Sequence, residues 1–239
     1  MSECAAAVAG EGTATRAAFY LCLARAFLPP RETGLFEAFS ELLADDLAEL
    51  GGDLGYPIDA PLAAFRAAMG QVRDRQTLLR LYSALFLVPP AAAPLNAAVY
   101  LDGSLNGVAA AAIERAYRDS GVERRDGFGD LPDHVACQLE FVAMLLAREA
   151  AGQLPVRGVS ADWFLDGFVR GWAPALRGAI AHAEAERSAP RVYGALATVL
   201  DHAVAHDLRG YRRPVDPAAV RRAALLRSFG LGEAPQRAP

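Results

Sequence analysis

The chain is built from segments in which apolar residues recur every three or four positions, and these segments end near prolines or glycines. This spacing places apolar side chains along one face of an α-helix. Nowhere do four or more β-branched residues alternate with polar ones, as they would in a half-buried strand. The sequence therefore predicts an all-α fold, a single globular domain of about ten helices.

The boundaries of the expected helices follow from this punctuation. Pro29-Pro30 and Pro89-Pro90 each end a periodic segment, and Pro174 predicts a break between two helices, because proline lacks the N–H that continues a helix. The region from 91 to 107 has no clear period and is expected to be a loop. The expected helices cover about 15–28, 35–50, 61–69, 72–87, 108–119, 132–150, 162–168, 175–187, 191–208 and 217–227.

The two ends of the chain differ in composition from the rest. Residues 1–15 are small, polar and mildly acidic, so we expect a flexible tail, followed by a helical domain over 16–228 and a frayed tail over 229–239. The start lacks the basic residues and apolar run of a secretory signal. No apolar run is long enough to cross a bilayer. We therefore expect a cytoplasmic protein without stable membrane association.

Charge and cysteine content narrow the possible partners. The formal net charge is −4, and all 24 basic residues are arginine. The chain thus has no basic field of the kind that nucleic acids require, and we expect no nucleic-acid partner. Cys4, Cys22 and Cys137 form no close-spaced pair for a metal or a redox disulfide, which favours a reducing compartment.

The sequence contains few of the patterns that mark catalytic sites. There is no phosphate loop followed by lysine, and no Gly-x-Ser-x-Gly turn. His134 and Glu140 are six residues apart, about 600° around a helix, and so lie on opposed sides. His202 and His206 are four apart and share a face, a spacing that suits a metal, but no third ligand stands at a fixed spacing. We expect no enzyme activity, metal or cofactor; a small helical metalloenzyme using these two histidines is the alternative.

One stretch, from Leu131 to Leu145, combines a loop with the start of an amphipathic helix. Pro132 suits a first helical turn, and Asp133 places a carboxylate at the positive end of the helix dipole. Apolar residues then recur from Val135 onward, so Asp133 and His134 are expected to be partly exposed, where the apolar stripe meets solvent. An acid and an imidazole there could bind a basic, partly apolar ligand. A capped core helix with two solvated polar residues is the alternative.

Four patches in this order resemble the TorD/DmsD family of redox-enzyme maturation chaperones, and they span residues 16–197. The first two are Arg16-x-x-x-Tyr20-x-x-Leu23-Ala24-Arg25-Ala26-Phe27 with Pro29-Pro30, and Tyr82-x-x-Leu85-Phe86-x-x-Pro89 with Tyr100-Leu101-Asp102. The third is Leu131-Pro132-Asp133-His134 with Leu139-Glu140-Phe141. The fourth contains Trp163-Phe164, Phe168, Trp172, Leu176, Pro190, Tyr193 and Leu196-Ala197.

This resemblance implies a cytoplasmic chaperone that binds the twin-arginine signal peptide and the apo catalytic subunit of a molybdenum-containing oxidoreductase and assists cofactor insertion before export. A twin-arginine leader offers a cationic pair followed by an apolar stretch, which an apolar groove with carboxylates at its rim would complement. The peptide-binding residues that we expect are Tyr82, Leu85, Phe86, Pro89, Tyr100, Asp102, Pro132, Asp133, His134 and Glu140. For Leu85 and Phe86 the alternative is a plain core position.

Two departures from the family pattern concern the client. Ala97-Ala98 stand where family members often carry Glu-Ser, and Asp130-Leu131 replace a glutamate ahead of the Pro-Asp-His motif. Neither the client nor the oligomeric state follows from the sequence. A helical regulator with a ligand pocket is a further alternative, because all-α folds host many functions.

Overall fold

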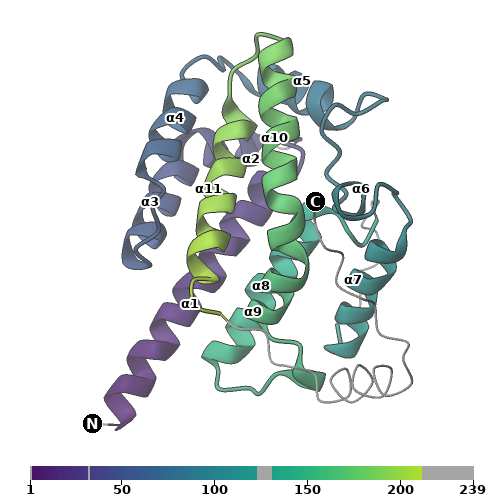
Figure 1. Ribbon diagram of the computed structural model, residues 1–239. Helices are drawn as coiled ribbons and strands as arrows, with labels where there is room; N and C mark the ends of the chain where they lie inside the picture. The colour runs from purple at the N-terminus through teal and green to yellow at the C-terminus, as the bar shows by residue number, and fades with distance from the viewer. Residues whose placement is uncertain (1, 32, 123–130, 212–239) are drawn as a thin grey trace, which may run out of the picture. The chain divides into compact units, whose positions relative to one another are not determined.

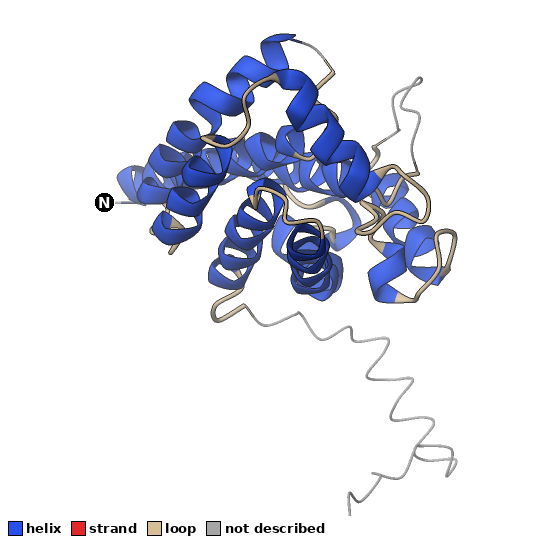
Figure 2. Cartoon of the chain, turned by 90° about the horizontal axis from the view of Figure 1, so that it is seen from above, coloured by secondary structure: helices blue, strands red, loops and turns tan. Residues whose placement is uncertain are grey.

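The computed structural model describes residues 2–31, 33–122 and 131–211, and Figure 1 shows their arrangement. The described residues up to Arg209 form one compact unit. Within the described ranges the regular structure is helical, as Figure 2 shows, and the one β-type contact is an isolated bridge between Asn96 and His134. The predicted all-α class is confirmed. The helix predicted over 217–227 and the predicted tail over 229–239 lie outside the described residues.

The α-helices of the described residues are α1 (Ser2–Ala26), α2 (Thr33–Glu37), α3 (Leu43–Asp53), α4 (Asp59–Met69), α5 (Arg75–Phe86), α6 (Ala98–Leu101), α7 (Val108–Asp119), α8 (Val135–Ala150), α9 (Ala161–Phe164), α10 (Arg170–Glu186) and α11 (Val192–Asp207). Two π-helical turns, η1 (Ala38–Leu42) and η3 (Leu165–Val169), join α2 to α3 and α9 to α10. A short 3₁₀ turn, η2 (Val156–Gly158), precedes α9.

The apolar faces of these helices meet in one core. α1 packs against α8 and α3, α4 packs against α3 and α11, and α11 packs against α10. In Figure 1, α10 and α11 run side by side in front of α1 and α8. On α1, Phe19 and Leu23 are fully buried at helical spacing, and Phe27, the residue after the helix, is fully buried as well. Burial of such side chains stabilises the fold by about 1.5–3 kcal/mol each.

Helix α1 is longer than predicted. It begins at Ser2, so residues expected to form a tail are helical, while the predicted end near Leu28 is close to the observed end at Ala26. The reason is composition: the segment is rich in alanine, the best helix former, and contains no proline before Pro29. The sequence did not reveal this part of the helix, because its apolar and polar residues are not separated onto two faces.

The break predicted at Pro174 is absent. Helical structure continues from α9 through η3 into α10, and Pro174 lies inside α10. An interior proline costs a helix about 3 kcal/mol. Here Trp172 and Leu176, on either side of it, are fully buried. Tertiary packing therefore outweighs the local cost of the proline. The sequence alone does not show this packing.

Candidate functional site

The connection that follows α5 is fastened to the start of α8. Ala93 N–H donates to the Leu85 carbonyl at 2.9 Å, Val135 N–H to the Leu95 carbonyl at 2.8 Å, and Ala97 N–H to the Asp133 carbonyl at 3.1 Å. The short helix α6 begins directly afterwards, inside the region predicted to be a loop. These contacts bring together two of the sequence patches, the one around Tyr82 to Asp102 and the one around Asp133.

Asp133 lies at the centre of this junction and is fully buried. Its Oδ2 accepts a hydrogen bond from Ala98 N–H at 2.9 Å, and its Oδ1 accepts one from the Asn96 side-chain amide at 3.2 Å. The carboxylate therefore satisfies a free donor at the start of α6. Our prediction of partial exposure was wrong, because the groups that cover Asp133 come from a segment about 35 residues earlier in the chain.

His134 caps α8 and is also buried, at 5% exposure. Its Nδ1 accepts a hydrogen bond from Ala136 N–H at 3.1 Å, so the proton of a neutral ring sits on Nε2. The prediction that His134 is partly exposed was therefore wrong. Pro132 lies before the helix and not in its first turn, since α8 starts at Val135; its carbonyl accepts the Tyr117 hydroxyl at 3.0 Å.

Two further residues extend the hydrogen bonds of Asp133 to α10. The buried Gln138 donates from Nε2 to the Asp133 carbonyl at 2.7 Å, and its Oε1 accepts the Trp172 indole N–H at 3.0 Å. We call Asn96, Asp133, Gln138 and Trp172 the buried clamp, in which Asn96 is half-buried and the other three residues are buried. Sequence reasoning assigned no role to Asn96 or Gln138, because their partners lie far along the chain. Trp172 stood out only as part of an aromatic pattern.

The apolar residues expected to line a groove lie in the core. Leu85 is fully buried, and Phe86 is 6% exposed. The Tyr82 hydroxyl donates to the Phe27 carbonyl at 3.1 Å, and its ring contacts Phe86. The prediction that these three side chains face a groove was wrong, because all three are buried. The alternative, a plain core position, holds for Leu85 and Phe86. Periodicity identified the buried face of α5 but not its role.

The remaining residues of the predicted set reach the surface. Pro89 and Glu140 are exposed. Tyr100 is half-buried; its hydroxyl donates to the Pro94 carbonyl at 2.9 Å, and burial raises its pKa. Asp102 is exposed and accepts hydrogen bonds from Ser104 N–H at 3.1 Å and Ala109 N–H at 2.7 Å. Asp102 thus holds the turn between α6 and α7, while Glu140 points from α8 to solvent.

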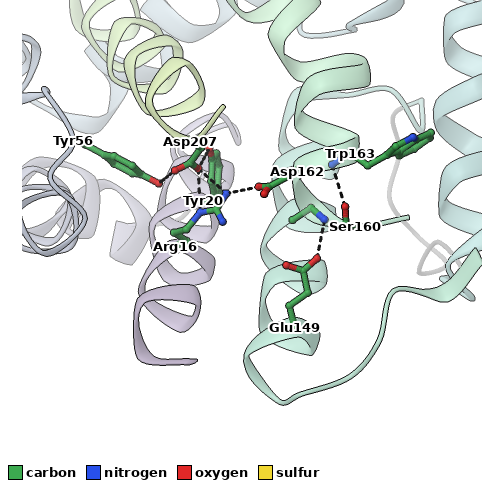
Figure 3. Close-up of polar contacts among 9 residues, drawn as sticks. Arg16, Tyr20, Tyr56, Glu149, Ser160, Asp162, Trp163 and Asp207 are labelled. Carbon is green, nitrogen blue, oxygen red and sulfur yellow. Dashed lines mark hydrogen bonds and ion pairs between the residues drawn. The ribbon is translucent and has the colours of Figure 1, made fainter. Parts of the chain in front are cut away.

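A second polar cluster joins α1, α11 and the connection between α3 and α4 (Figure 3). Asp207 Oδ2 accepts the Tyr20 hydroxyl at 2.7 Å and Arg16 Nε at 3.2 Å, and Oδ1 accepts the Tyr56 hydroxyl at 2.6 Å. Arg16 also donates to Asp162, just after the start of α9, at 2.7 Å. Burial, followed by the charge of Asp207, raises the pKa of both tyrosines. Arg16 and Tyr20 belong to the first sequence patch, but nothing in the sequence indicated Asp207 as their partner.

The two histidines of the metalloenzyme alternative are used in packing. His202 Nδ1 lies 2.9 Å from the Pro57 carbonyl, and the His206 ring meets the Tyr56 ring edge-on at 5.2 Å. Within the described ranges no three His, Cys, Asp or Glu side chains come together as a metal site would require. Neither histidine is therefore placed with the further ligands that metal chemistry would need.

The family model of the nitrate reductase delta subunit matches residues 52–177, a little over half of the chain. The chain belongs to this family. The match runs from α3 into α10 and includes all four residues of the buried clamp, and it confirms the resemblance to the TorD/DmsD chaperones. The protein is thus a member of a family of redox-enzyme maturation chaperones.

Two other comparisons concern solved structures and curated proteins. A crystal structure described as "a Putative Redox Enzyme Maturation Protein From Archaeoglobus Fulgidus" is similar, with a TM-score of 0.46 and 19% identity, over 78% of this chain and 91% of that one. Among curated proteins, none matches the sequence.

This member of the nitrate reductase delta subunit family carries an open groove of about 490 Å³ on the outer face of α5. The groove lies on the side of α5 away from Tyr82, Leu85 and Phe86. Val88, which lines it, is 58% exposed; beside the groove, Leu87 is 47% exposed and Pro89 is exposed as well. Its lining residues are Gln76, Leu79, Arg80, Ser83, Ala84 and Val88.

Across the residues that the structure describes, none of the helices combines the length and the apolar character needed to span a membrane.

Proposed function

We propose that the protein binds the twin-arginine signal peptide of a molybdenum-containing oxidoreductase subunit, together with the apo form of that subunit, and acts in the cytoplasm before export. The family match over residues 52–177 carries this proposal. It is the family of maturation chaperones, and the matched region includes the junction where the signature residues meet. Assistance with cofactor insertion is part of the proposal.

The outer face of α5 supports a site for the apolar part of a leader. Leu79, Ala84 and Val88 line its groove, and exposed Leu87 and Pro89 extend the apolar surface. Large exposed apolar residues gathered in one place typically mark a binding surface. A leader helix or extended segment could bury its apolar stretch there.

The exposed acids Glu140 and Asp102 are the proposed partners of the arginine pair. Asp102 is held by two backbone N–H groups, whereas no hydrogen bond to Glu140 is found among the described residues. In this proposal Asp133, His134 and Pro132 act by position. They fix the connection between α5 and α6 against α8 and do not contact the peptide. Tyr82, Leu85 and Phe86 support α5 from within.

A direct test is calorimetric titration of the full chain with a synthetic peptide that has two adjacent arginines followed by an apolar stretch. A matched peptide carries glutamines in place of the arginines. We expect the first peptide to bind at least about tenfold more tightly, since one charge-assisted hydrogen bond contributes roughly 1.5–3 kcal/mol. Equal binding of the two peptides, or binding of neither, would contradict the proposal.

A further inference from the structure

Glu184 is an acid buried near the end of α10, with 1% of the residue exposed. Its Oε1 accepts hydrogen bonds from Tyr193 N–H at 3.0 Å and Gly194 N–H at 3.1 Å, both in the first turn of α11. These N–H groups have no partner within their own helix, and Glu184 supplies an acceptor for both. Glu184 therefore fastens the start of α11 to α10.

The second oxygen of Glu184 has a different environment. Oε2 is buried and has no hydrogen-bond partner among the described residues. It lies so close to Gly194 that a Cβ at that position would collide with it, which accounts for glycine there. An ionised oxygen buried without a donor costs more free energy than a neutral hydroxyl group left unpaired in the same place. The site thus favours the protonated form.

The charges around Glu184 do not remove this preference. Burial raises the pKa of Glu184 to about 7, although its two backbone hydrogen bonds and the charge of Arg191 act in the opposite direction. Tyr193 also faces it, and burial raises the pKa of that phenol. Of the other ionisable groups nearby, Arg187 donates to the Ala183 carbonyl, and Tyr82 of α5 donates to the Phe27 carbonyl.

Tyr193 connects this acid to the core beneath α5. Its ring contacts Phe86 at 5.0 Å, Tyr82 at 5.7 Å and Phe39 at 5.9 Å between centroids. The backbone N–H of the same residue is held by Glu184. A change at Glu184 therefore reaches the packing of α5 through one residue.

We propose that Glu184 is a protonation-sensitive latch, which holds the first turn of α11 against α10 when neutral and loosens that turn and the Tyr193 ring when ionised. The anion needs a donor for Oε2, and opening the first turn admits water to supply one. This inference concerns the fold and does not depend on the proposed function.

The direction of the pH effect follows from linkage. The pKa of Glu184 in the folded protein, about 7, lies above the value of about 4.3 expected in the unfolded chain. The folded state therefore binds the proton more tightly. The stabilisation is fully present below about pH 4, is lost as the pH rises toward 7, and stays lost above it.

The test follows the carboxyl group and the backbone together by NMR. We expect the Glu184 carboxyl to titrate with a midpoint of about 7 and the Tyr193 and Gly194 amides to shift with the same midpoint. Hydrogen exchange of the first α11 amides, corrected for its intrinsic pH dependence, should be faster at about pH 8 than at about pH 5.5, by at least about tenfold. A carboxyl midpoint near 4.3, or unchanged protection, would overturn the latch.

Two variants make the test specific. Glu184→Gln keeps the shape and cannot ionise, so the exchange of these amides should no longer depend on pH. Glu186→Gln is the matched control, because Glu186 is exposed and pairs with His182 at 3.2 Å; it should behave as the wild type. Retained pH dependence in Glu184→Gln would overturn the latch. Should that variant not fold, the wild-type titration decides by itself.

Discussion

Asp133 is a buried acid whose carboxylate accepts hydrogen bonds from two donors, so its charge should matter for stability. In Asp133→Asn the amide group must face either Ala98 N–H or the Asn96 side chain, both of which donate to Asp133 now. A buried donor left without an acceptor costs about 1–3 kcal/mol. We therefore expect Asp133→Asn to lower the free energy of unfolding by about this amount in a urea titration.

Asp46→Asn is the control for this change, because Asp46 is exposed on α3. It should alter stability by less than about 0.5 kcal/mol. Equal urea midpoints for Asp133→Asn and the wild type would show that the clamp is unimportant for the fold. The same result would favour the exposed position for Asp133 that the sequence suggested.

At the scale of residues, the sequence drew attention to Asp133 and His134 but did not reveal what surrounds them. The Pro-Asp-His pattern marked Asp133 and His134 because an acid and a capping residue often precede a helix. Their burial depends on the segment around Asn96, whose approach is set by the fold. Gln138 illustrates the same limit, since its partner Trp172 lies 34 residues away.

The junction of α1, α11 and the connection between α3 and α4 should depend on Asp207. Tyr20→Phe and Tyr56→Phe each remove one hydroxyl that donates to this carboxylate. A hydrogen bond to a charged group contributes about 1.5–3 kcal/mol, so thermal and urea unfolding should show a loss of this size for each variant. The double variant should lose less than the sum if the two donors act as one unit.

Tyr193→Phe is the matched control for the tyrosine variants. Its hydroxyl is buried but has no hydrogen-bond partner among the described residues. Removing that hydroxyl should leave stability unchanged or raise it slightly, because no bond is lost. Losses of equal size in all three phenylalanine variants would mean that packing, and not Asp207, accounts for the effect.

At the scale of elements, helix bounds were predicted best where the apolar periodicity is strong. Helix α7 has the predicted bounds, 108–119, and α11 differs from its prediction by one residue at each end. The start of α1 was missed because alanine-rich helix has little apolar contrast. The join of α9 to α10 was missed because the packing of Trp172 and Leu176 outweighs the local effect of Pro174.

At the scale of the whole molecule, the family patches predicted the class of protein, and our proposed surface for a ligand lies on the other face of α5 from the residues first expected to form it. Residues 82, 85 and 86 belong to the buried face of α5. The groove on the outer face is lined by Leu79, Ala84 and Val88, which carry no pattern of their own. Which face of a helix stays open depends on the helices packed against it, and a single sequence does not contain that information directly.

The most direct test of the account is whether the groove on α5 binds a leader. Val88→Asp places a charge on this surface, and Leu154→Asp places one on an exposed leucine between α8 and α9; the two residues are 58% and 88% exposed. Calorimetric titration with a twin-arginine leader peptide should show Val88→Asp binding about tenfold more weakly, about 1.4 kcal/mol, with an unchanged melting temperature. Leu154→Asp should bind like the wild type. Wild-type affinity in Val88→Asp, or equal weakening in both variants, would contradict the account.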